Sequence, residues 1–256
     1  MNAPENRPEP RSQTDEPPRV CAVVAAYNEA GKITALAQRL RAAIEQMGLP
    51  ARYVFVVQGT DGTRDEIETI QRHHDDVQMY YSPTPMGVGP AYRQGFAMVG
   101  DGDDLIVMID GDGEHDPIYI AEFYQAMQQQ GADLVIGSRY IGAGRAEGSP
   151  LWKRIASKVM NKTVSILFRI SAVDKTGGYR FMRADLGRKV AAMTQGRGFD
   201  FYLEFLVRAA QSGARIIEVP IVYRFNDEGG SKMYKFDTAV NYMRLFWRLL
   251  FRRGCS

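Results

Sequence analysis

Short apolar runs alternate with stretches of helical spacing through the first half of the chain. Runs of about four to eight apolar residues are typical of buried strands, and apolar residues at every third or fourth position are typical of amphipathic helices. Strands that alternate with helices predict an α/β fold in which helices flank a mostly parallel central sheet. The expected strands are 19–26, 53–57, 77–81, 105–109 and 132–137, and the helices between them are 31–47, 64–74, 86–99 and 118–130.

The second half of the chain has a different pattern. A glycine-rich loop at 142–150 is followed by expected helices at 151–170 and 199–211, and then by a pair of strands at 216–223 that Pro220 interrupts. The last expected helix, 234–253, is basic and aromatic with one apolar face, which suits a helix lying in a membrane interface. The alternative is that this apolar face packs on the helix's own domain or on a second subunit, as in a homo-oligomer.

Composition narrows the class of protein. With 256 residues, 45% of them apolar, the chain can bury one sizeable core. A net charge of +2 gives no overall field that would indicate nucleic acid. Two cysteines form no disulfide framework and fit a reducing compartment, the cytoplasm. No apolar run approaches the roughly 18–20 residues that span a bilayer, so we expect a soluble protein or one lying on a membrane surface.

The expected domain organisation has three parts. Residues 1–19 are rich in Pro, Glu and Arg and are expected to form a disordered tail. Residues 20–233 form the α/β domain, and 234–256 form the C-terminal basic amphipathic helix.

The most informative segment is the apolar run 105–109 with the acidic residues that follow it. Asp110, Asp112 and Glu114 stand at alternate positions directly after the run. Like charges this close repel each other and resist burial, whereas a divalent cation needs such oxygen ligands. The segment therefore indicates a Mg²⁺ or Mn²⁺ site at the carboxyl end of a parallel strand. A solvated acidic turn before a helix that Asp116 caps is the alternative.

Polar residues also follow the other expected strands. Tyr27 and Glu29 come after the first strand, where ligands bind in doubly wound sheets, although this segment could simply cap the next helix. The turn 58–63 follows the second strand, and its Gln58 could offer a donor and an acceptor to a nucleotide base. Arg139 follows the fifth strand and is suited to bind an oxyanion or to pair with a local acid.

The expected helix 199–211 carries two acids on one face. Asp200 and Glu204 are four residues apart, which places them one turn from each other. Either could be a catalytic base, and a solvated face or an ion pair is the alternative.

The order of these motifs resembles the family-2 inverting glycosyltransferases, and most closely their polyprenyl-phosphate (dolichyl-phosphate) sugar synthases. The resemblance covers residues 20 to about 235 and rests on the ordered set rather than on any one motif. In order, the motifs are 27–29, 60–63, 87–89, 110–112, 137–140, 176–180, 199–204, 218–221 and 229–232.

The resemblance implies a GT-A fold, a nucleoside-diphosphate sugar donor (GDP- or UDP-hexose) and a divalent metal. It implies that Asp110, Asp112 and Glu114 bind the metal, with Asp110 also at the diphosphate. The residues implied at the nucleotide sugar also include Tyr27, Glu29, Gln58, Asp61 and Lys232. The acceptor phosphate is expected to meet Arg139, Lys153, Arg154 and Ser157, and the catalytic residues are expected among Asp112, Arg139, Asp200 and Glu204.

The chain departs from the family pattern at two places. Val57-Gln58 stands where two adjacent Asp residues are usual, and Asn226 stands where an Arg is usual, with Arg224 as a possible substitute. The first departure bears on which nucleotide base is recognised.

The predicted function is transfer of mannose or glucose, with inversion, to a polyprenyl phosphate on the cytoplasmic face of a membrane. The sequence is also compatible with two alternatives: transfer to a sugar hydroxyl, which needs a true base such as Asp200 or Glu204, and an inactive protein that only binds nucleotide sugars.

Overall fold

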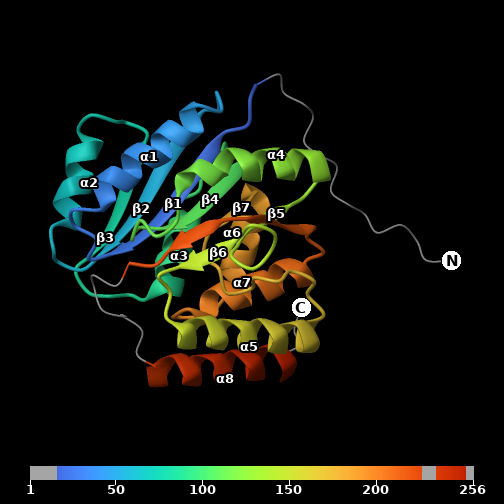
Figure 1. Cartoon of the computed structure of the whole chain (residues 1–256). Coiled ribbons are helices and arrows are strands. Elements are labelled where there is room, and N and C mark those ends of the chain that lie inside the picture. Colours follow the sequence, from blue (N-terminus) through green and yellow to red (C-terminus); the bar gives the residue numbers. More distant parts are fainter. Residues whose placement is uncertain (1–15, 227–234, 252–256) are drawn as a thin grey trace.

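The computed structural model describes residues 16–226 and 235–251 (Figure 1). Its centre is a seven-stranded sheet with the order β3-β2-β1-β4-β7-β5-β8. The strands are β1 (Val20–Tyr27), β2 (Ala51–Gln58), β3 (Val77–Ser82), β4 (Leu105–Asp110), β5 (Leu134–Ser138), β7 (Arg180–Arg183) and β8 (Ile216–Pro220). Only β7 runs antiparallel to its neighbours, β4 and β5, so the predicted mostly parallel sheet is confirmed.

Helices cover both faces of this sheet. The helices of the described residues are α1 (Ile33–Glu45), α2 (Thr63–Gln71), α3 (Val88–Ala97), α4 (Ile120–Gln130), α5 (Leu151–Phe168), α6 (Ala184–Met193), α7 (Asp200–Gln211) and α8 (Lys235–Phe251), with a 3₁₀ turn, η1 (Pro117–Tyr119), before α4. A small second sheet pairs β6 (Arg145–Glu147) with β9 (Val222–Arg224).

Two apolar cores lie on the two faces, because successive side chains of a strand point to opposite sides. In β1, Cys21 and Val23 belong to the core under α3, α6 and α7, whereas Ala22 and Val24 belong to the core under α1, α2 and α4. The strands are buried on both faces, which explains why they read as continuous apolar runs rather than as alternating ones.

Three elements were not predicted from the sequence. The antiparallel strand β7 and the helix α6 lie in a segment that had no expected element, and β6 lies inside the expected loop 142–150. β7 has only four residues, and β6 pairs with a strand far along the chain, so neither carries a local signal long enough to recognise.

α5 and α8 lie side by side at the edge of the molecule farthest from α1 and α4 (Figure 1). Phe168 at the end of α5 stacks on Phe246 of α8, with ring centroids 6.4 Å apart. Leu245 and Leu249 of α8 are buried in the core against α7. The C-terminal helix therefore packs on its own chain through one face. Within residues 16–226 and 235–251, no helix is long and apolar enough to cross a bilayer.

Candidate active site

Three of the motif-bearing segments meet at one edge of the sheet because the carboxyl ends of parallel strands are adjacent. Tyr27 at the end of β1 is in register with Gln58 at the end of β2. Asp110 at the end of β4 lies beside Ala25 on the other side of β1. This is the edge at which open α/β sheets bind ligands.

The acidic segment continues straight from β4 into this edge. Asp110 is the last residue of the strand, and its Oδ1 accepts hydrogen bonds from the hydroxyls of Tyr92 and Tyr202, each 2.6 Å long. Burial raises the pKa of Asp110 even though both tyrosines stabilise its charged form. Burial and the nearby charges of Asp110, Glu114 and Glu29 raise the pKa of Asp112 well above its ordinary value.

Glu114 does not join the other two carboxylates. Its side chain accepts hydrogen bonds from the Tyr223 hydroxyl and from the Asn226 backbone N–H, the second 2.9 Å long. Within residues 16–226 and 235–251, no group of three His, Cys, Asp or Glu side chains is placed to hold a metal ion. The three-carboxylate ligand set expected from the sequence is therefore not assembled here, because the Glu114 carboxylate binds Tyr223 of β9 and the backbone N–H of Asn226 just after that strand.

The remaining pair, Asp110 and Asp112, still suits a divalent cation. Mg²⁺-type sites commonly use one or two carboxylates and complete their coordination with substrate phosphates and water. The raised pKa of both carboxyls comes from burial next to like charge, which is the electrostatic cost that a bound cation removes.

On the side predicted to bind the nucleotide, two loops are tied together. The Asp61 carboxylate accepts hydrogen bonds from the Ala30 N–H and from the Thr63 hydroxyl, and the Thr63 hydroxyl also accepts one from the Glu29 N–H. Asp61 thereby fixes the segment that carries Tyr27 and Glu29 against the turn after β2.

The structure gives Gln58 a different partner from the one expected. Gln58 is only 4% exposed, and its Oε1 accepts the backbone N–H groups of Met86 and Gly87 at 2.6 and 3.1 Å. It positions the start of α3, and its acceptor oxygen is already used within the protein.

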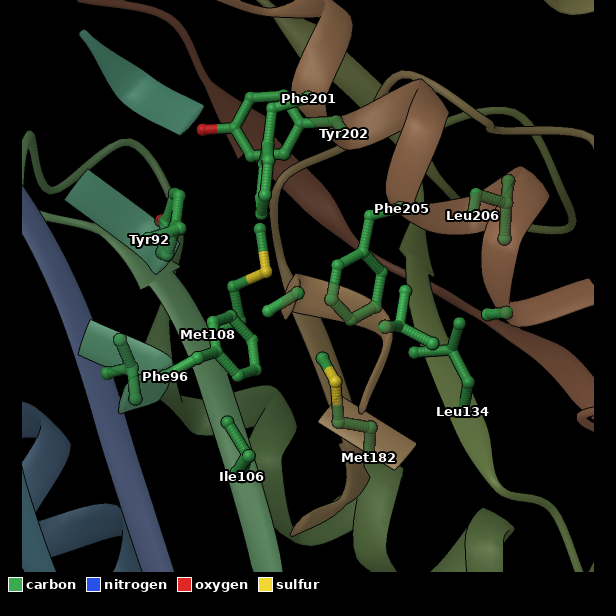
Figure 2. Close-up of a cluster of buried hydrophobic side chains, with 14 of the residues drawn as sticks. Tyr92, Phe96, Ile106, Met108, Leu134, Met182, Phe201, Tyr202, Phe205 and Leu206 are labelled. Atoms are coloured by element: carbon green, nitrogen blue, oxygen red, sulfur yellow. The ribbon is translucent and has the colours of Figure 1, made fainter. Parts of the chain in front are cut away.

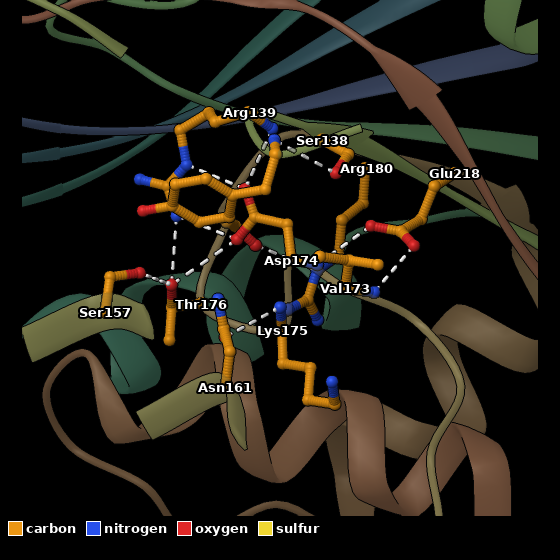
Figure 3. Close-up of polar contacts among 12 residues, drawn as sticks. Ser138, Arg139, Ser157, Asn161, Val173, Asp174, Lys175, Thr176, Arg180 and Glu218 are labelled. Carbon is orange, nitrogen blue, oxygen red and sulfur yellow. Dashed lines mark hydrogen bonds and ion pairs between the residues drawn. The ribbon is translucent and has the colours of Figure 1, made fainter. Parts of the chain in front are cut away.

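A buried polar cluster surrounds Arg139, beyond the end of β5 (Figure 3). The Arg139 Nε and Nη2 atoms donate to the two Asp174 carboxylate oxygens at 2.7 and 2.8 Å, and Nη2 also donates to the Thr176 hydroxyl at 2.9 Å. The Ser157 hydroxyl lies 2.7 Å from that of Thr176. Of the two alternatives for Arg139, pairing with a local acid is observed, and a predicted acceptor residue, Ser157, belongs to the same cluster.

Tyr223 links this cluster to the acidic segment. Its hydroxyl donates to Glu114, and the Arg139 guanidinium lies 5.5 Å from the centre of its ring. The predicted donor side and the predicted acceptor side are therefore separated by a single aromatic side chain.

The other predicted acceptor cations lie on α5. Lys153 places its ammonium 4.0 Å from the centre of the Phe225 ring, next to the strand that carries Tyr223. Arg154 is exposed on the outer face of the helix. Lys232 lies outside the described residues.

Asp200 and Glu204 stabilise the fold around α7. Glu204 is completely buried, and its Oε2 accepts the backbone N–H groups of Gln195 and Gly196 together with Arg248 of α8. Asp200 is 3% exposed and accepts the N–H of Gly198. Side chains this buried offer no surface to a substrate, so the ion-pair alternative describes them better than the role of base.

Several residues at the site had no predicted role. Tyr92 lies three residues after the motif 87–89 and Asp174 two residues before the motif 176–180, and the partner of each comes from another element. Glu218, in the motif 218–221, accepts the N–H groups of Val173 and Asp174 and so holds the loop that carries Asp174. Only their nearness to these motifs points to these residues in the sequence, because sequence spacing does not reveal which distant side chains meet.

The sheet with one antiparallel strand, and the carboxylate pair at its edge, define the fold and site of a GT-A glycosyltransferase. The chain belongs to glycosyl transferase family 2, whose family model matches residues 21–190.

Two similar proteins cover most of the chain. It is 32% identical over 219 residues to the undecaprenyl-phosphate mannosyltransferase of Micrococcus luteus, an alignment that covers 84% of this chain and 87% of that protein. It is 29% identical over 222 residues to the polyprenol monophosphomannose synthase of Mycolicibacterium smegmatis, covering 84% of this chain and 81% of that protein.

Solved structures share the fold. The glucosyl-3-phosphoglycerate synthase of Mycobacterium tuberculosis, in complex with Mn²⁺, uridine diphosphate and phosphoglyceric acid, gives a TM-score of 0.67 at 15% identity over 93% of this chain and 80% of that chain. A mannosyltransferase of Pyrobaculum calidifontis, in complex with GDP-Man and Mn²⁺, gives 0.60 at 16% identity over 94% of this chain and 66% of that chain.

Proposed function

We propose that the protein transfers a hexose from a nucleoside-diphosphate sugar to a polyprenyl phosphate, with inversion at the anomeric carbon, and that mannose is the preferred hexose. The observation that carries the proposal is the 32% identity over most of the chain to an undecaprenyl-phosphate mannosyltransferase. The names of both relatives support a mannosyl group and a polyprenyl-phosphate acceptor.

The donor side of the reaction is assigned to the edge formed by β1, β2 and β4. Asp110 and Asp112 would hold a Mg²⁺ or Mn²⁺ ion, which when bound offsets charge on the leaving diphosphate. The loops that Asp61 ties together would receive the nucleoside. A GDP-hexose donor is supported by the GDP-Man complex of a protein with the same fold, and a UDP-hexose by the uridine-diphosphate complex of another.

The acceptor side is assigned to the cluster around Arg139. A phosphate oxygen of the acceptor would attack the anomeric carbon, and the bond from that carbon to the diphosphate would break with its electron pair leaving on the diphosphate. Arg139 and Ser157 of this cluster, together with Lys153 over the Phe225 ring, would place the phosphate near Tyr223 and hence near the acidic segment.

This chemistry needs no strong base. The second pKa of a phosphate monoester is about 6, so the acceptor is already ionised at neutral pH and needs positioning rather than deprotonation. Transfer to a sugar hydroxyl would need a base, and the two acids considered for that role, Asp200 and Glu204, are buried in contacts with backbone N–H groups and Arg248. The structure therefore favours the phosphate acceptor.

We place the protein on a membrane surface through α5 and α8. Large apolar side chains of α5 stand in solvent beside Arg154, Lys158 and Lys162, and α5 contains no acidic residue. Exposed apolar residues flanked by cations suit an interface with anionic lipid. The exposed apolar residues are Leu151, Trp152, Ile155, Val159, Ile166 and Leu167 of α5, and Met243 and Trp247 of α8.

The experiment is a donor panel with and without the lipid acceptor. Radiolabelled GDP-mannose and UDP-glucose are each incubated with the protein, Mn²⁺ and undecaprenyl phosphate in detergent, and label in the organic phase is counted. We expect GDP-mannose to label the lipid, and the D112N variant to lose that product.

Three controls give the result its meaning. Omitting the lipid reports hydrolysis of the donor by water, EDTA tests the need for a metal, and a soluble sugar replaces the lipid in a third arm. Label that appears on the soluble sugar but not on the lipid would overturn the proposed acceptor. An absence of turnover with both donors would favour a binding protein.

A further inference from the structure

Asp110 accepts hydrogen bonds from two buried tyrosines whose helices are far apart in the sequence. The hydroxyls of Tyr92 in α3 and Tyr202 in α7 both donate to the same carboxylate oxygen, Oδ1, at 2.6 Å. A carboxylate that served only the fold would be satisfied equally well with one donor on each oxygen. Here both donors converge on one side, which fixes the direction in which the second oxygen points.

The position of the second oxygen, Oδ2, depends on the absence of a side chain at Gly178. A Cβ atom added at Gly178 would lie 2.8 Å from Asp110 Oδ2 and 2.9 Å from the Tyr202 atoms Cε1 and Cζ. The missing side chain of Gly178 is therefore what lets the carboxylate and the Tyr202 ring approach the chain just before β7.

Packing fixes the two tyrosines themselves. Tyr92 is fully buried and stacks on Phe201 with ring centroids 5.7 Å apart and planes 7° apart. Tyr202 is 2% exposed and meets Tyr92 edge-on at 5.9 Å, and the two rings lie in one cluster with Phe201 above Met108 of β4 (Figure 2). Because close-packed rings do not rotate freely, the two hydroxyls offer fixed donors.

We propose that Tyr92 and Tyr202 are positioning residues that hold the Asp110 carboxylate so that its Oδ2 meets the divalent cation of the donor complex. The inference rests on the proposed function, since it assigns the cation to Asp110 and Asp112. Groups that orient a metal ligand in this way typically contribute a factor of roughly 10–100 in metal affinity.

The test measures metal binding directly. Tyr92→Phe and Tyr202→Phe keep the rings and remove only the hydroxyls. Mn²⁺ is titrated into each protein with saturating GDP, and in a second arm with UDP, while the EPR signal of free Mn²⁺ is recorded. We expect each variant to bind Mn²⁺ roughly 10-fold more weakly than the wild type, and the double variant roughly 100-fold more weakly or worse.

A matched control separates positioning from a general effect on the core. Tyr53 is 2% exposed, lies on β2, and its hydroxyl finds no hydrogen-bond partner among the described residues, so Tyr53→Phe makes the same chemical change away from Asp110. It should leave Mn²⁺ binding unchanged. In turnover assays, the site variants should raise the KM for donor and leave the KM for lipid acceptor unchanged.

The outcomes are distinguishable. If the wild type binds Mn²⁺ in neither nucleotide arm, the metal assignment of the proposed function fails and this inference fails with it. If the wild type binds Mn²⁺ and the two tyrosine variants bind it as tightly, only the positioning role is overturned. Equal rises in the KM of donor and acceptor would also reject it, because they would indicate a loss of fold rather than of metal geometry.

Discussion

The Arg139 guanidinium and the Asp174 carboxylate face each other in a two-point ion pair, with Nε–Oδ2 at 2.7 Å and Nη2–Oδ1 at 2.8 Å. The Asp174 side chain is completely buried, and the Arg139 side chain is 15% exposed. Burial opposes the charge on both groups, but each partner outweighs that cost for the other, so the pKa of Arg139 is raised and that of Asp174 is lowered. The pair fixes the direction of the guanidinium at the proposed acceptor site.

Asp174→Asn should destabilise the protein in a pH-dependent way. Removing one partner of a buried pair costs about 3–5 kcal/mol, because the other charge is left uncompensated. Since the pKa of Asp174 is lowered in the folded state, its contribution is present above the unfolded pKa of about 3.9 and is lost as the pH falls through the folded value. The difference in unfolding free energy between wild type and variant, measured in urea, should therefore shrink from pH 7 to pH 3. A constant difference would contradict this account.

Arg139→Ala should reduce transfer to lipid phosphate far more than hydrolysis of the donor by water. Hydrolysis needs no acceptor phosphate, whereas transfer depends on the cluster of Arg139, Thr176 and Ser157. The ratio of the two rates measures the effect, and we expect it to fall by roughly 100-fold, the size of a lost charge-assisted contact. Arg154→Ala, on the exposed side of α5, is the comparison. Equal losses of both rates in Arg139→Ala would assign this arginine to the donor or to the fold.

Asp112→Asn should raise stability without metal and abolish stabilisation by metal. A carboxyl whose folded pKa is raised destabilises the fold once the pH exceeds its unfolded pKa, so at pH 7 the amide removes a cost. If this cost is about 1 kcal/mol, the melting temperature should rise by about 2–4 °C in EDTA. Adding Mn²⁺ and GDP should raise the melting temperature of the wild type but not of the variant. A variant that still gains stability from Mn²⁺ would remove Asp112 from the metal site.

Gly178→Ala should impair the donor side of the reaction. The added Cβ would meet Asp110 Oδ2 at 2.8 Å and the Tyr202 ring at 2.9 Å, so either both of these side chains or the backbone at Gly178 must move. We expect a rise of roughly 10-fold or more in the donor KM, by the same metal-orienting effect, with little change in the acceptor KM. The neighbouring Gly177→Ala is the control, since its nearest contact would be an ordinary 3.4 Å. Equal kinetic effects of the two substitutions would refute the close approach at Gly178.

Replacing Trp152 or Ile155 with alanine should weaken binding to anionic liposomes. Both side chains are exposed on α5, 44% and 53% respectively, and each would lose apolar area that enters the interface. Ile118→Ala is the matched control, because Ile118 is 71% exposed on η1, which directly precedes α4. Figure 1 shows α4 and α5 at opposite edges of the molecule. Sedimentation with vesicles at increasing salt gives the measurement. Similar binding by Ile155→Ala and Ile118→Ala would reject α5 as the membrane face.

The α/β class, most strands of the sheet and the position of the acidic segment could all be predicted from the order of residues alone. The apolar runs of β1, β2 and β4 are continuous because both of their faces are buried, and this pattern is local and readable. Parallel strands also place their carboxyl ends together, so the meeting of Tyr27, Gln58 and Asp110 at one edge followed from the order of elements alone.

The partner of each polar side chain, by contrast, depends on how the elements pack in three dimensions. Asp110 meets tyrosines 18 and 92 positions away, Arg139 meets an aspartate 35 positions away, and Glu114 meets a tyrosine 109 positions away. The short strand β7 brings Gly178 to Asp110, and its four residues carry no periodicity. Such pairings depend on how helices pack across the sheet. A shift of less than 1 Å in the donor–acceptor distance decides whether a hydrogen bond forms, and the spacing of residues in the sequence does not specify positions that finely.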